Sequence, residues 1–214
     1  MRLILIRHGE TAHNKGNVTL GRADVPLNDR GIAQAKTIAS SFTRRPAAIY
    51  SSPLRRALDT ASMIGQHTGA DVKVDDDLIE MDVGEMEHLT GGELRARYPD
   101  FLRTWMSDEC ADVRMPGGET LREVQDRAWR FVEGAADRHA TETVAAATHN
   151  FVILTLVCRA LGVPLAGFRR MRPAVGSKSL IEVRDGQARL LRFNDTAHLA
   201  LAGLADDPDG EVRR

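Results

Sequence analysis

The sequence is poor in cysteine and contains no long hydrophobic run. Its two cysteines, Cys110 and Cys158, match neither a CxxC metal spacing nor a disulfide framework, so we expect reduced, buried thiols. The apolar run Met1–Ile6 is too short for the core of a signal peptide. The most apolar later segment, 151–163, contains an arginine and is shorter than the roughly 20 residues of a membrane-spanning helix. We therefore predict a cytoplasmic protein that is neither secreted nor inserted in a membrane.

The sequence also lacks an excess of either charge. It has 29 Lys and Arg residues against 30 Asp and Glu residues, which leaves a formal net charge of -1. No global positive field exists to attract nucleic acid or anionic lipid, so any basic site must be local. A chain of 214 residues, 43% of them hydrophobic, is suited to one compact domain with a modest insertion at most. We expect this domain to cover residues 1–204 and the polar residues 205–214 to form a flexible tail.

Candidate strands and helices alternate along the chain. Short apolar runs predict strands buried on both faces, at 3–6, 47–51, 72–74 and 143–148. Apolar residues at helical spacing predict helices that begin after Asn28 or Asp29, after an N-cap at Ser52, at Glu119 and at Phe151. Asp185-Gly186, between two further apolar runs, predicts a β-hairpin.

This alternation predicts an α/β fold, a three-layer sandwich with a mostly parallel central sheet, an antiparallel edge hairpin and a small inserted cap. The segment from Leu78 to Tyr98 loses regular periodicity, and Tyr98-Pro99 breaks the short helix that begins near Gly92. We interpret residues 80–118 as the cap, an excursion over the sheet. The edge hairpin permits a homodimer.

Chemically active side chains follow three of the predicted strands. Arg7 and His8 follow the first strand, Arg55 and Arg56 lie in the helix after the second, and His149 follows the late strand. Open α/β sheets bind ligands at the carboxyl ends of their strands, where helix N-termini also point. A lone histidine or arginine there is more often structural or solvated. Two histidines and several arginines together favour a binding site.

The charge of this cluster favours an anion over a metal ion. A dication would lie beside permanently charged arginines, and the sequence has no HExxH motif, no His-x-His and no cysteine pair. Guanidinium groups and helix N-termini instead suit phosphate oxygens. Segment 16–23 resembles a P-loop only superficially, because Arg22 and Ala23 stand where Lys and Ser or Thr are required. A GxSxG serine-hydrolase motif is also missing.

Five short blocks occur in order between residue 3 and about residue 153. They are Leu5-Ile6-Arg7-His8-Gly9-Glu10-Thr11 with Asn14 and 21–31, Ser51-Ser52-Pro53-Leu54-Arg55-Arg56-Ala57, Leu78-Ile79-Glu80 with Gly84 and Glu87, Pro116-Gly117-Gly118-Glu119-Thr120, and Thr148-His149. Together the blocks resemble the histidine phosphatase superfamily, in the branch that includes the cofactor-dependent phosphoglycerate mutases. The late segment 194–199 also resembles phosphatase members of this family.

The resemblance implies a role for each residue of a small set. His8 is the nucleophile that takes up the phosphoryl group as phosphohistidine, and Glu80 protonates the leaving oxygen. Arg7, Arg56 and His149 clamp the phosphoryl oxygens. Arg56 is preferred to the arginine before it because the family's clamp residue directly precedes this alanine. The positions that line the substrate are Thr11, Asn14, Gly21 and Asn150.

The implied function is a metal-independent phosphomonoester hydrolase that acts on a small phosphorylated metabolite, without a cofactor. A cofactor-dependent phosphoglycerate mutase is the alternative. The mutases resemble one another in a longer insertion between the third and fourth blocks than the segment 85–115 found here. An inactive phospholigand-binding module is a further alternative, and the intact catalytic residues argue against it.

Several positions depart from the family pattern. Asn150-Phe151 replaces the usual Gly-Gly after the second histidine. His13 stands where an aromatic residue is common, Met86 replaces a frequent Trp, and His88 replaces a frequent Gly. These residues alter the rim of the pocket, and with it the choice of substrate, or they serve plain packing.

Overall fold

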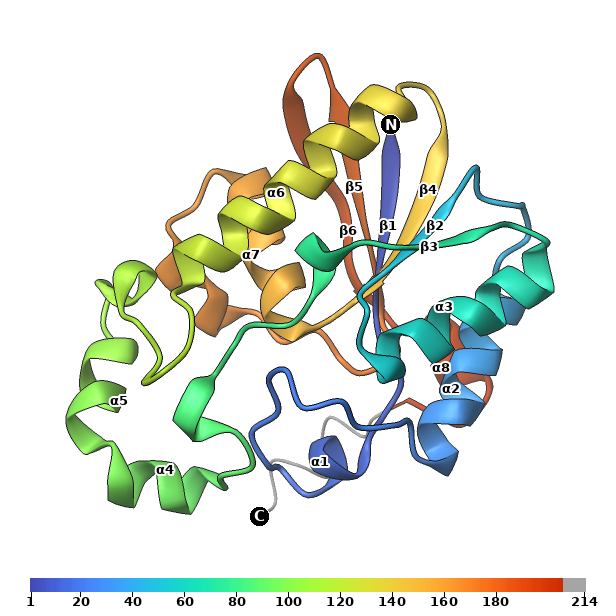
Figure 1. Cartoon of the computed structure of the whole chain (residues 1–214). Helices are drawn as coiled ribbons and strands as arrows, with labels where there is room; N and C mark the ends of the chain where they lie inside the picture. The colour runs from blue at the N-terminus through green and yellow to red at the C-terminus, as the bar shows by residue number, and fades with distance from the viewer. Residues whose placement is uncertain (206–214) are drawn as a thin grey trace.

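A six-stranded sheet forms the centre of the computed structural model, which describes residues 1–205 (Figure 1). The strands are β1 (Arg2–Arg7), β2 (Ile49–Ser51), β3 (Val72–Val74), β4 (Thr143–Thr148), β5 (Lys178–Arg184) and β6 (Gln187–Asp195). Their order is β3-β2-β4-β1-β5-β6. The first four strands pair in parallel, whereas β5 is antiparallel to both β1 and β6. The predicted parallel sheet with an antiparallel edge hairpin is confirmed.

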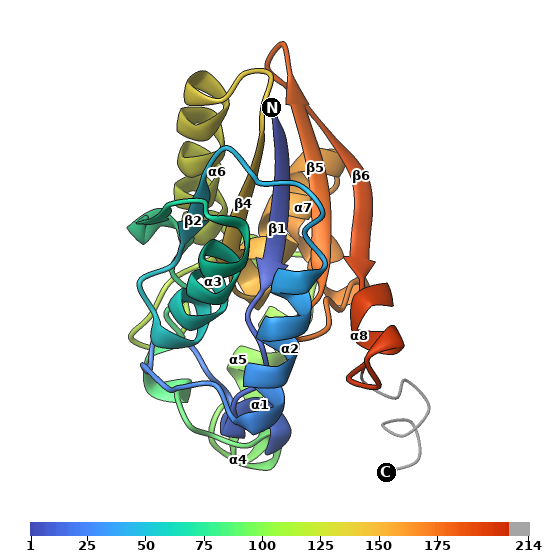
Figure 2. The same cartoon turned by 90° about the vertical axis from the view of Figure 1, so that its right-hand side faces the viewer.

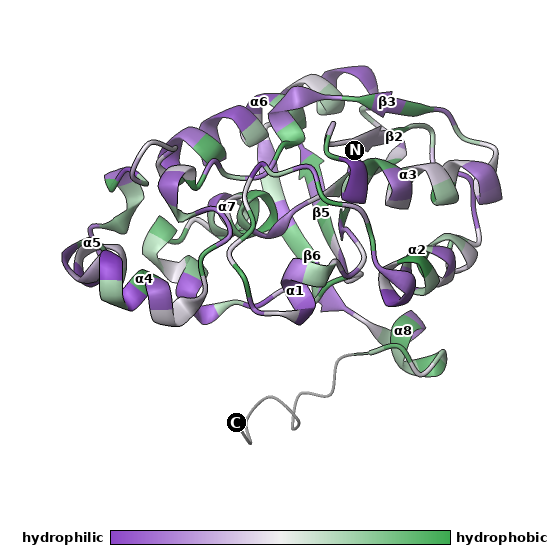
Figure 3. Ribbon diagram, turned by 60° about the horizontal axis from the view of Figure 1, so that its bottom comes forward, coloured by the Kyte–Doolittle hydropathy of each residue, from purple (hydrophilic) through white to green (hydrophobic). Residues whose placement is uncertain are grey.

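Helices cover both faces of the sheet and make three layers (Figures 1 and 2). The helices on one face are α2 (Asp29–Ser40) and α3 (Arg55–Thr68), and those on the other are α6 (Leu121–Arg138) and α7 (Asn150–Leu161). Strand β1 alternates its side chains between two hydrophobic cores: Leu3 and Leu5 join the core under α6 and α7, and Ile6 joins the core under α2 and α3. In Figure 3 these helices alternate hydrophobic and hydrophilic residues, as one buried face requires.

Left-handed residues end helices and turn the hairpin where the sequence predicts them. The C-caps of α3 and α7 are Gly69 and Gly162, with φ angles of 71° and 65°. The turn between β5 and β6 consists of Asp185 and Gly186, with φ angles of 52° and 73°. Positive φ at both central residues is what a two-residue type I′ turn requires.

The start of α3 differs from the prediction. The sequence pattern predicts Ser52 as the N-cap and Pro53 as the first helical residue, whereas the helix begins at Arg55 with Leu54 as its N-cap. The Ser52 hydroxyl oxygen accepts a hydrogen bond from Leu54 N at 3.3 Å and also lies 2.7 Å from His149 Nε2. The Ser52 hydroxyl group thus contacts both the backbone that leads into α3 and a tertiary partner, His149.

Residues 80–118 contain only short helices. These are η2 (Gly84–Met86), α4 (Gly91–Arg97), α5 (Pro99–Trp105) and η3 (Cys110–Asp112). α4 and α5, green in Figure 1, lie toward the end of the sheet at which β1 ends. Pro99, predicted to break a helix, is the first residue of α5, a position that tolerates proline because no N–H is needed there.

The sequence pattern does not predict four further elements. They are α1 (Ala12–Lys15), η1 (Asp76–Leu78), η4 (Leu165–Arg170) and α8 (Ala197–Leu201). Each is too short to display a helical period in its apolar residues. Within residues 1–205, none of the helices combines the length and the apolar content needed to cross a membrane. Residues 206–214 of the predicted tail lie outside the described part of the chain.

Candidate active site

The ends of three adjacent strands bring the two predicted histidines together. His8 follows β1 and His149 follows β4, and these strands pair in register with Arg7 opposite Thr148. The imidazole rings of the two histidines consequently lie with their centroids 5.1 Å apart. β2 pairs with the other edge of β4 and leads through Ser52 to α3. The site thus lies at the carboxyl edge of the sheet, as the sequence predicts.

The hydrogen bond made by His8 defines its tautomer. The side chain is 3% exposed, and Nδ1 lies 2.7 Å from the carbonyl oxygen of Gly9. A carbonyl oxygen can only accept, so Nδ1 carries the proton and Nε2 carries the lone pair. Burial, with the charges of Arg56 and Arg7, lowers the pKa of His8 well below its usual value. The imidazole is therefore neutral at pH 7, as a nucleophile must be.

Arg56 is a fully buried cation beside these rings. Its Nη1 donates to the carbonyl oxygen of Ala23 at 2.8 Å, and its Nη2 donates to that of Gly21 at 2.7 Å. Among the described residues its buried Nε has no hydrogen-bond partner. A Cβ atom on Gly21 would lie 2.7 Å from Val83 Cγ2, so the loop approaches closely only with glycine. Gly21 thus holds Arg56 through its backbone.

The pKa of Glu80 is shifted in the opposite direction to the pKa values of His8 and His149. Its side chain is 3% exposed, and burial raises its pKa, against the opposing hydrogen bonds and the charge of Arg56. Its carboxylate accepts from Met81 N at 2.8 Å and from Phe151 N at 3.2 and 3.4 Å. A raised pKa keeps a larger share of the carboxyl groups protonated near neutral pH, as a general acid requires.

The remaining predicted residues support the loops around this cluster. Arg7 donates from Nη1 to the carbonyl oxygen of Pro173 at 2.6 Å, and its charge acts on both histidines and on Glu80. Thr11 and Asn14 form a capping box on α1, in which each side chain accepts from the other's backbone N–H. Asn150 is the half-buried first residue of α7.

Two further side chains support the site without a role predicted from the sequence: Glu87, which belongs to the third block, and Arg127, which no motif marks. Glu87 accepts from Gly21 N at 2.6 Å and from Ala23 N at 3.1 Å, and so fixes the loop that Arg56 grips. Arg127, 7% exposed on α6, donates to backbone oxygens of the segment 77–80. A detectable signal exists for Arg127, because it lies three residues after Val124 on the apolar face of its helix.

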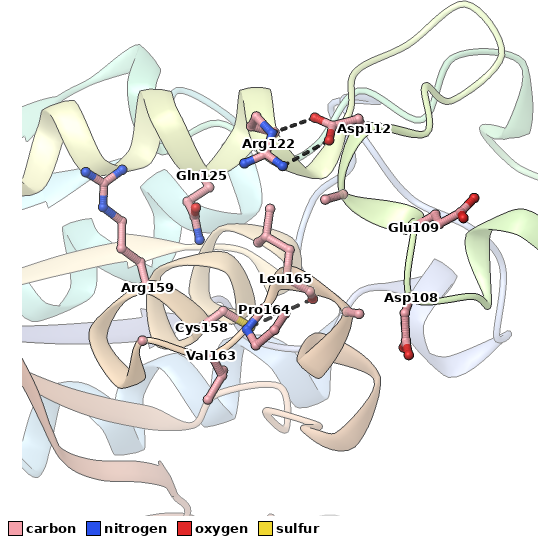
Figure 4. Close-up of a pocket in the computed structure, with 13 residues that line it drawn as sticks. Asp108, Glu109, Asp112, Arg122, Gln125, Cys158, Arg159, Val163, Pro164 and Leu165 are labelled. Carbon is pink, nitrogen blue, oxygen red and sulfur yellow. Dashed lines mark hydrogen bonds and ion pairs between the residues drawn. The ribbon is translucent and has the colours of Figure 1, made fainter.

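A separate cavity of about 580 Å³ lies between α6, α7 and η3 (Figure 4). Arg122, which lines it, is paired with Asp112, with Nη2 2.9 Å from Oδ2. None of the predicted site residues lines this cavity, and its second arginine, Arg159, is also paired with a carboxylate, with Nη1 3.8 Å from Asp126 Oδ1. We assign it no part in the chemistry.

The donor set at the strand ends suits an anion. Within residues 1–205, no group of three or more His, Cys, Asp or Glu side chains is arranged to hold a metal ion. Two guanidinium groups offer N–H donors, which match phosphoryl oxygens, and the neutral His8 ring presents the lone pair of Nε2. Fold and side chains together define an α/β protein whose sheet has, at its carboxyl edge, a cluster of groups suited to an anion.

The chain belongs to the histidine phosphatase superfamily (branch 1), whose family model matches residues 3–196. It is 34% identical over 200 residues to phosphoserine phosphatase 1 of Hydrogenobacter thermophilus, covering 93% of this chain and 94% of that one. Over 216 residues it is 31% identical to the metal-independent phosphoserine phosphatase of Arabidopsis thaliana, covering 99% and 89%. A structure of mycobacterial glucosyl-3-phosphoglycerate phosphatase with VO3 superposes with a TM-score of 0.83 at 30% identity, covering 91% and 99%. The predicted family and enzyme class are confirmed: the protein is a histidine phosphatase.

Proposed function

We propose that this enzyme hydrolyses small phosphomonoesters through a phosphohistidine on His8. The observation that carries the proposal is the hydrogen bond from His8 Nδ1 to Gly9 O, which leaves Nε2 as the nucleophilic atom of a neutral ring. Nε2 attacks phosphorus, an N–P bond forms, and the ester P–O bond breaks. Water then attacks the phosphohistidine, which releases inorganic phosphate and regenerates His8.

Cationic and neutral N–H donors bind the phosphoryl oxygens in this proposal. Arg56 has two of its guanidinium nitrogens fixed on carbonyl oxygens, and its buried Nε is the donor left for the substrate. Arg7 and His149 complete the clamp. Phosphoryl transfer through a loose transition state depends mainly on positioning and on charge stabilisation, which these groups supply.

Glu80 is the proton donor to the leaving oxygen. Its raised pKa favours the protonated form that the first step requires, and the carboxylate then accepts a proton from the attacking water in the second. Glu80 gives up a proton in the first step and takes one up in the second, so the protons balance over the cycle. An ester and water thus give an alcohol and inorganic phosphate.

The substrate class that we propose is a small phosphorylated metabolite with a carboxyl group, such as phosphoserine. Similarity to proteins named phosphoserine phosphatase supports this choice. We also propose that residues 80–118 act as a cap that selects the substrate. Phosphate release from O-phospho-L-serine, 3-phosphoglycerate, glucosyl-3-phosphoglycerate and p-nitrophenyl phosphate, each with a chelator present, tests the proposal. Efficient turnover of a bulky sugar phosphate in preference to phosphoserine would contradict it.

The central prediction concerns the nucleophile. His8→Ala should lose all turnover, because the change removes the imidazole that forms the N–P bond, and it should leave the circular dichroism spectrum unchanged. His67→Ala, which removes an exposed imidazole on α3, is the matched control and should keep full activity. Rapid quench into alkaline denaturant, in which the N–P bond of phosphohistidine is stable, should trap label from a radiolabelled substrate on the wild type and none on His8→Ala. Turnover by pure His8→Ala protein would refute the mechanism.

A transfer assay separates hydrolysis from mutase activity. With 3-phosphoglycerate and catalytic 2,3-bisphosphoglycerate, we expect release of inorganic phosphate and no accumulation of 2-phosphoglycerate. Isomerisation without phosphate release would favour the mutase alternative. Absence of turnover with every phosphomonoester would favour a phospholigand-binding module.

We also propose a cytoplasmic location and a homodimer. Cys110 and Cys158 are buried and unpaired, which suits a reducing compartment. Strand β6 forms an edge of the sheet, where Leu191 is nearly half exposed, and an edge can pair with a second copy. Sedimentation analysis over a range of concentrations tests the dimer, and a monomer throughout would contradict it.

A further inference from the structure

Ser52 makes a contact that the phosphatase motifs do not explain. It lies just after β2, it is fully buried, and its hydroxyl oxygen is 2.7 Å from His149 Nε2. The same oxygen accepts a hydrogen bond from Leu54 N at 3.3 Å. The other ring nitrogen, His149 Nδ1, is buried and has no hydrogen-bond partner among residues 1–205. His149 is fully buried and lies beside the His8 ring.

Two tautomers of His149 are compatible with the heavy-atom distances, and they have opposite consequences. If Nε2 carried the proton, it would donate to the Ser52 oxygen, and the lone pair of Nδ1 would be left without a donor. If the Ser52 hydroxyl group donates to Nε2, then Nδ1 carries the proton and is a free N–H donor. Only the second arrangement offers a donor to an oxyanion. In the first, a lone pair would repel a phosphoryl oxygen.

Charge cannot replace this directional hydrogen bond. Burial and the charge of Arg56 lower the pKa of His149 well below its usual value, so the ring is neutral at pH 7. A neutral imidazole attracts an anion only through the N–H that points at it. The tautomer therefore decides whether this ring stabilises the transition state.

We infer that Ser52 is a positioning residue which holds His149 in the tautomer with the proton on Nδ1, ready to donate to a phosphoryl oxygen. The inference rests on the proposed function, because it assumes that a phosphoryl group occupies the site. The Ser52 oxygen can accept the hydrogen bond from Leu54 N at the same time, because its hydroxyl hydrogen remains available for Nε2. Fixing a histidine tautomer through the atom that does not touch the ligand is a general device in metal and catalytic sites.

The direct test reads the tautomer in the unmodified enzyme. Nitrogen NMR of histidine-labelled protein with bound orthovanadate should show His149 protonated at Nδ1 and unprotonated at Nε2. In Ser52→Ala the population of the other tautomer should rise. A wild-type spectrum with the proton on Nε2 would overturn the inference, whether or not any variant folds.

Kinetics provide the second test. Ser52→Ala should lower kcat and weaken vanadate inhibition about 10- to 100-fold, the range typical of lost orienting contacts. Ser52→Thr keeps the hydroxyl group and should restore most of the loss. The matched control is Ser51→Ala, which removes an equally buried hydroxyl group that donates to Ser52 O and does not contact His149. That control should stay within about twofold of the wild type, since a surplus local hydrogen bond contributes little.

The two proposals fail in different ways. In a His149→Asn background, Ser52→Ala should cause no further loss, because the residues act as one unit. If Ser52→Ala keeps full activity while His8→Ala has none, the tautomer inference fails and the proposed function stands. If His8→Ala remains active, the proposed function itself fails.

Discussion

At the scale of single residues, burial shifts the pKa values of three side chains, two of them downward and one upward. Burial disfavours charge, so it lowers the pKa of His8 and of His149 and raises that of Glu80. Arg56 and Arg7 add to this effect on the histidines and oppose it on the carboxyl group. These shifts favour a neutral His8 and a protonated Glu80, which is the combination that the proposed phosphoryl transfer from an ester needs.

This tuning predicts a bell-shaped pH profile for kcat. His8 must be neutral, so activity falls as pH drops through a pKa that lies below the usual histidine value. Glu80 must be protonated, so activity falls as pH rises through a pKa that lies above the usual glutamate value. Glu80→Gln should remove the alkaline limb and lower kcat for phosphoserine about 100-fold or more.

The leaving group supplies the control for Glu80→Gln. The loss should be much smaller with p-nitrophenyl phosphate, because p-nitrophenolate leaves without a proton. Steady-state kinetics with both substrates from pH 5 to pH 9 measure this difference. An equal loss with the two substrates would show that Glu80 does not act as the general acid.

At the scale of an element, helix α6 holds the segment that carries Glu80. Arg127 donates to the carbonyl oxygens of Asp77, Ile79 and Glu80, and its Nε lies 3.1 Å from Glu119 Oε1. Glu119 belongs to the fourth sequence block and also pairs with Arg22, with Nη2 2.9 Å from Oε1. The fourth block therefore supports Glu80 indirectly. Its Glu119 pairs with Arg127, and Arg127 donates hydrogen bonds to the backbone of the segment 77–80.

Arg127→Met should expose how much this support matters. The change leaves three carbonyl oxygens and a mostly buried carboxylate without their donor, so we expect a loss of about 3 kcal/mol in the free energy of unfolding. It should also lower kcat more than it raises KM, because Glu80 is displaced. Arg130→Met is the control on the same helix. It breaks a pair between Asp77 and an arginine that is 63% exposed, and its effect should stay within about 0.5 kcal/mol. Urea denaturation measures both, and equal losses would contradict the prediction.

At the scale of the whole molecule, an aromatic cluster fixes α5 to the body of the protein. Phe101 and Trp105 of α5 stack with their ring centroids 5.7 Å apart. The centroid of the Trp105 ring also lies 5.5 Å from that of Phe168 in η4 and 6.2 Å from that of Phe151 in α7. Phe151 N donates a hydrogen bond to the Glu80 carboxylate, so the aromatic cluster that anchors the segment 80–118 includes a residue that contacts the proposed general acid. The bulky residue in place of the family's glycine therefore joins the inserted segment to the site.

Trp105→Ala should weaken this connection. Removing a large buried ring should cost about 3 kcal/mol of the free energy of unfolding, and kcat should fall because the Phe151 N–H shifts relative to Glu80. Met106→Ala, next in sequence and 62% exposed, should change stability by less than about 0.5 kcal/mol. Thermal unfolding and phosphoserine kinetics on the pair provide the measurement. An unchanged kcat in Trp105→Ala would show that the packing of the segment 80–118 does not affect catalysis.

Most of the fold and the core of the site follow from sequence patterns. β-Rich apolar runs, helix caps and the Asp185-Gly186 turn predict the layers, because these signals act over a few residues. The histidines and Arg56 are found because strand ends and sequence blocks mark them. Short elements such as α1 and η4 are not predicted from the sequence, because they are too short to show a periodic pattern of apolar residues. Ser52 illustrates the other limit: its sequence context favours a helix cap, and a partner 97 positions away engages its hydroxyl group.

The sequence by itself determined the alternation of strands and helices, the chemistry available at the strand ends and the family to which the chain belongs. These depend on local backbone preferences and on the identity of side chains. The tertiary structure alone decided the tautomer of His8, the direction of each pKa shift and the partners of Arg127 and Ser52. Those properties depend on burial and on hydrogen-bond geometry between segments far apart in the chain, which come into existence only when the sheet assembles.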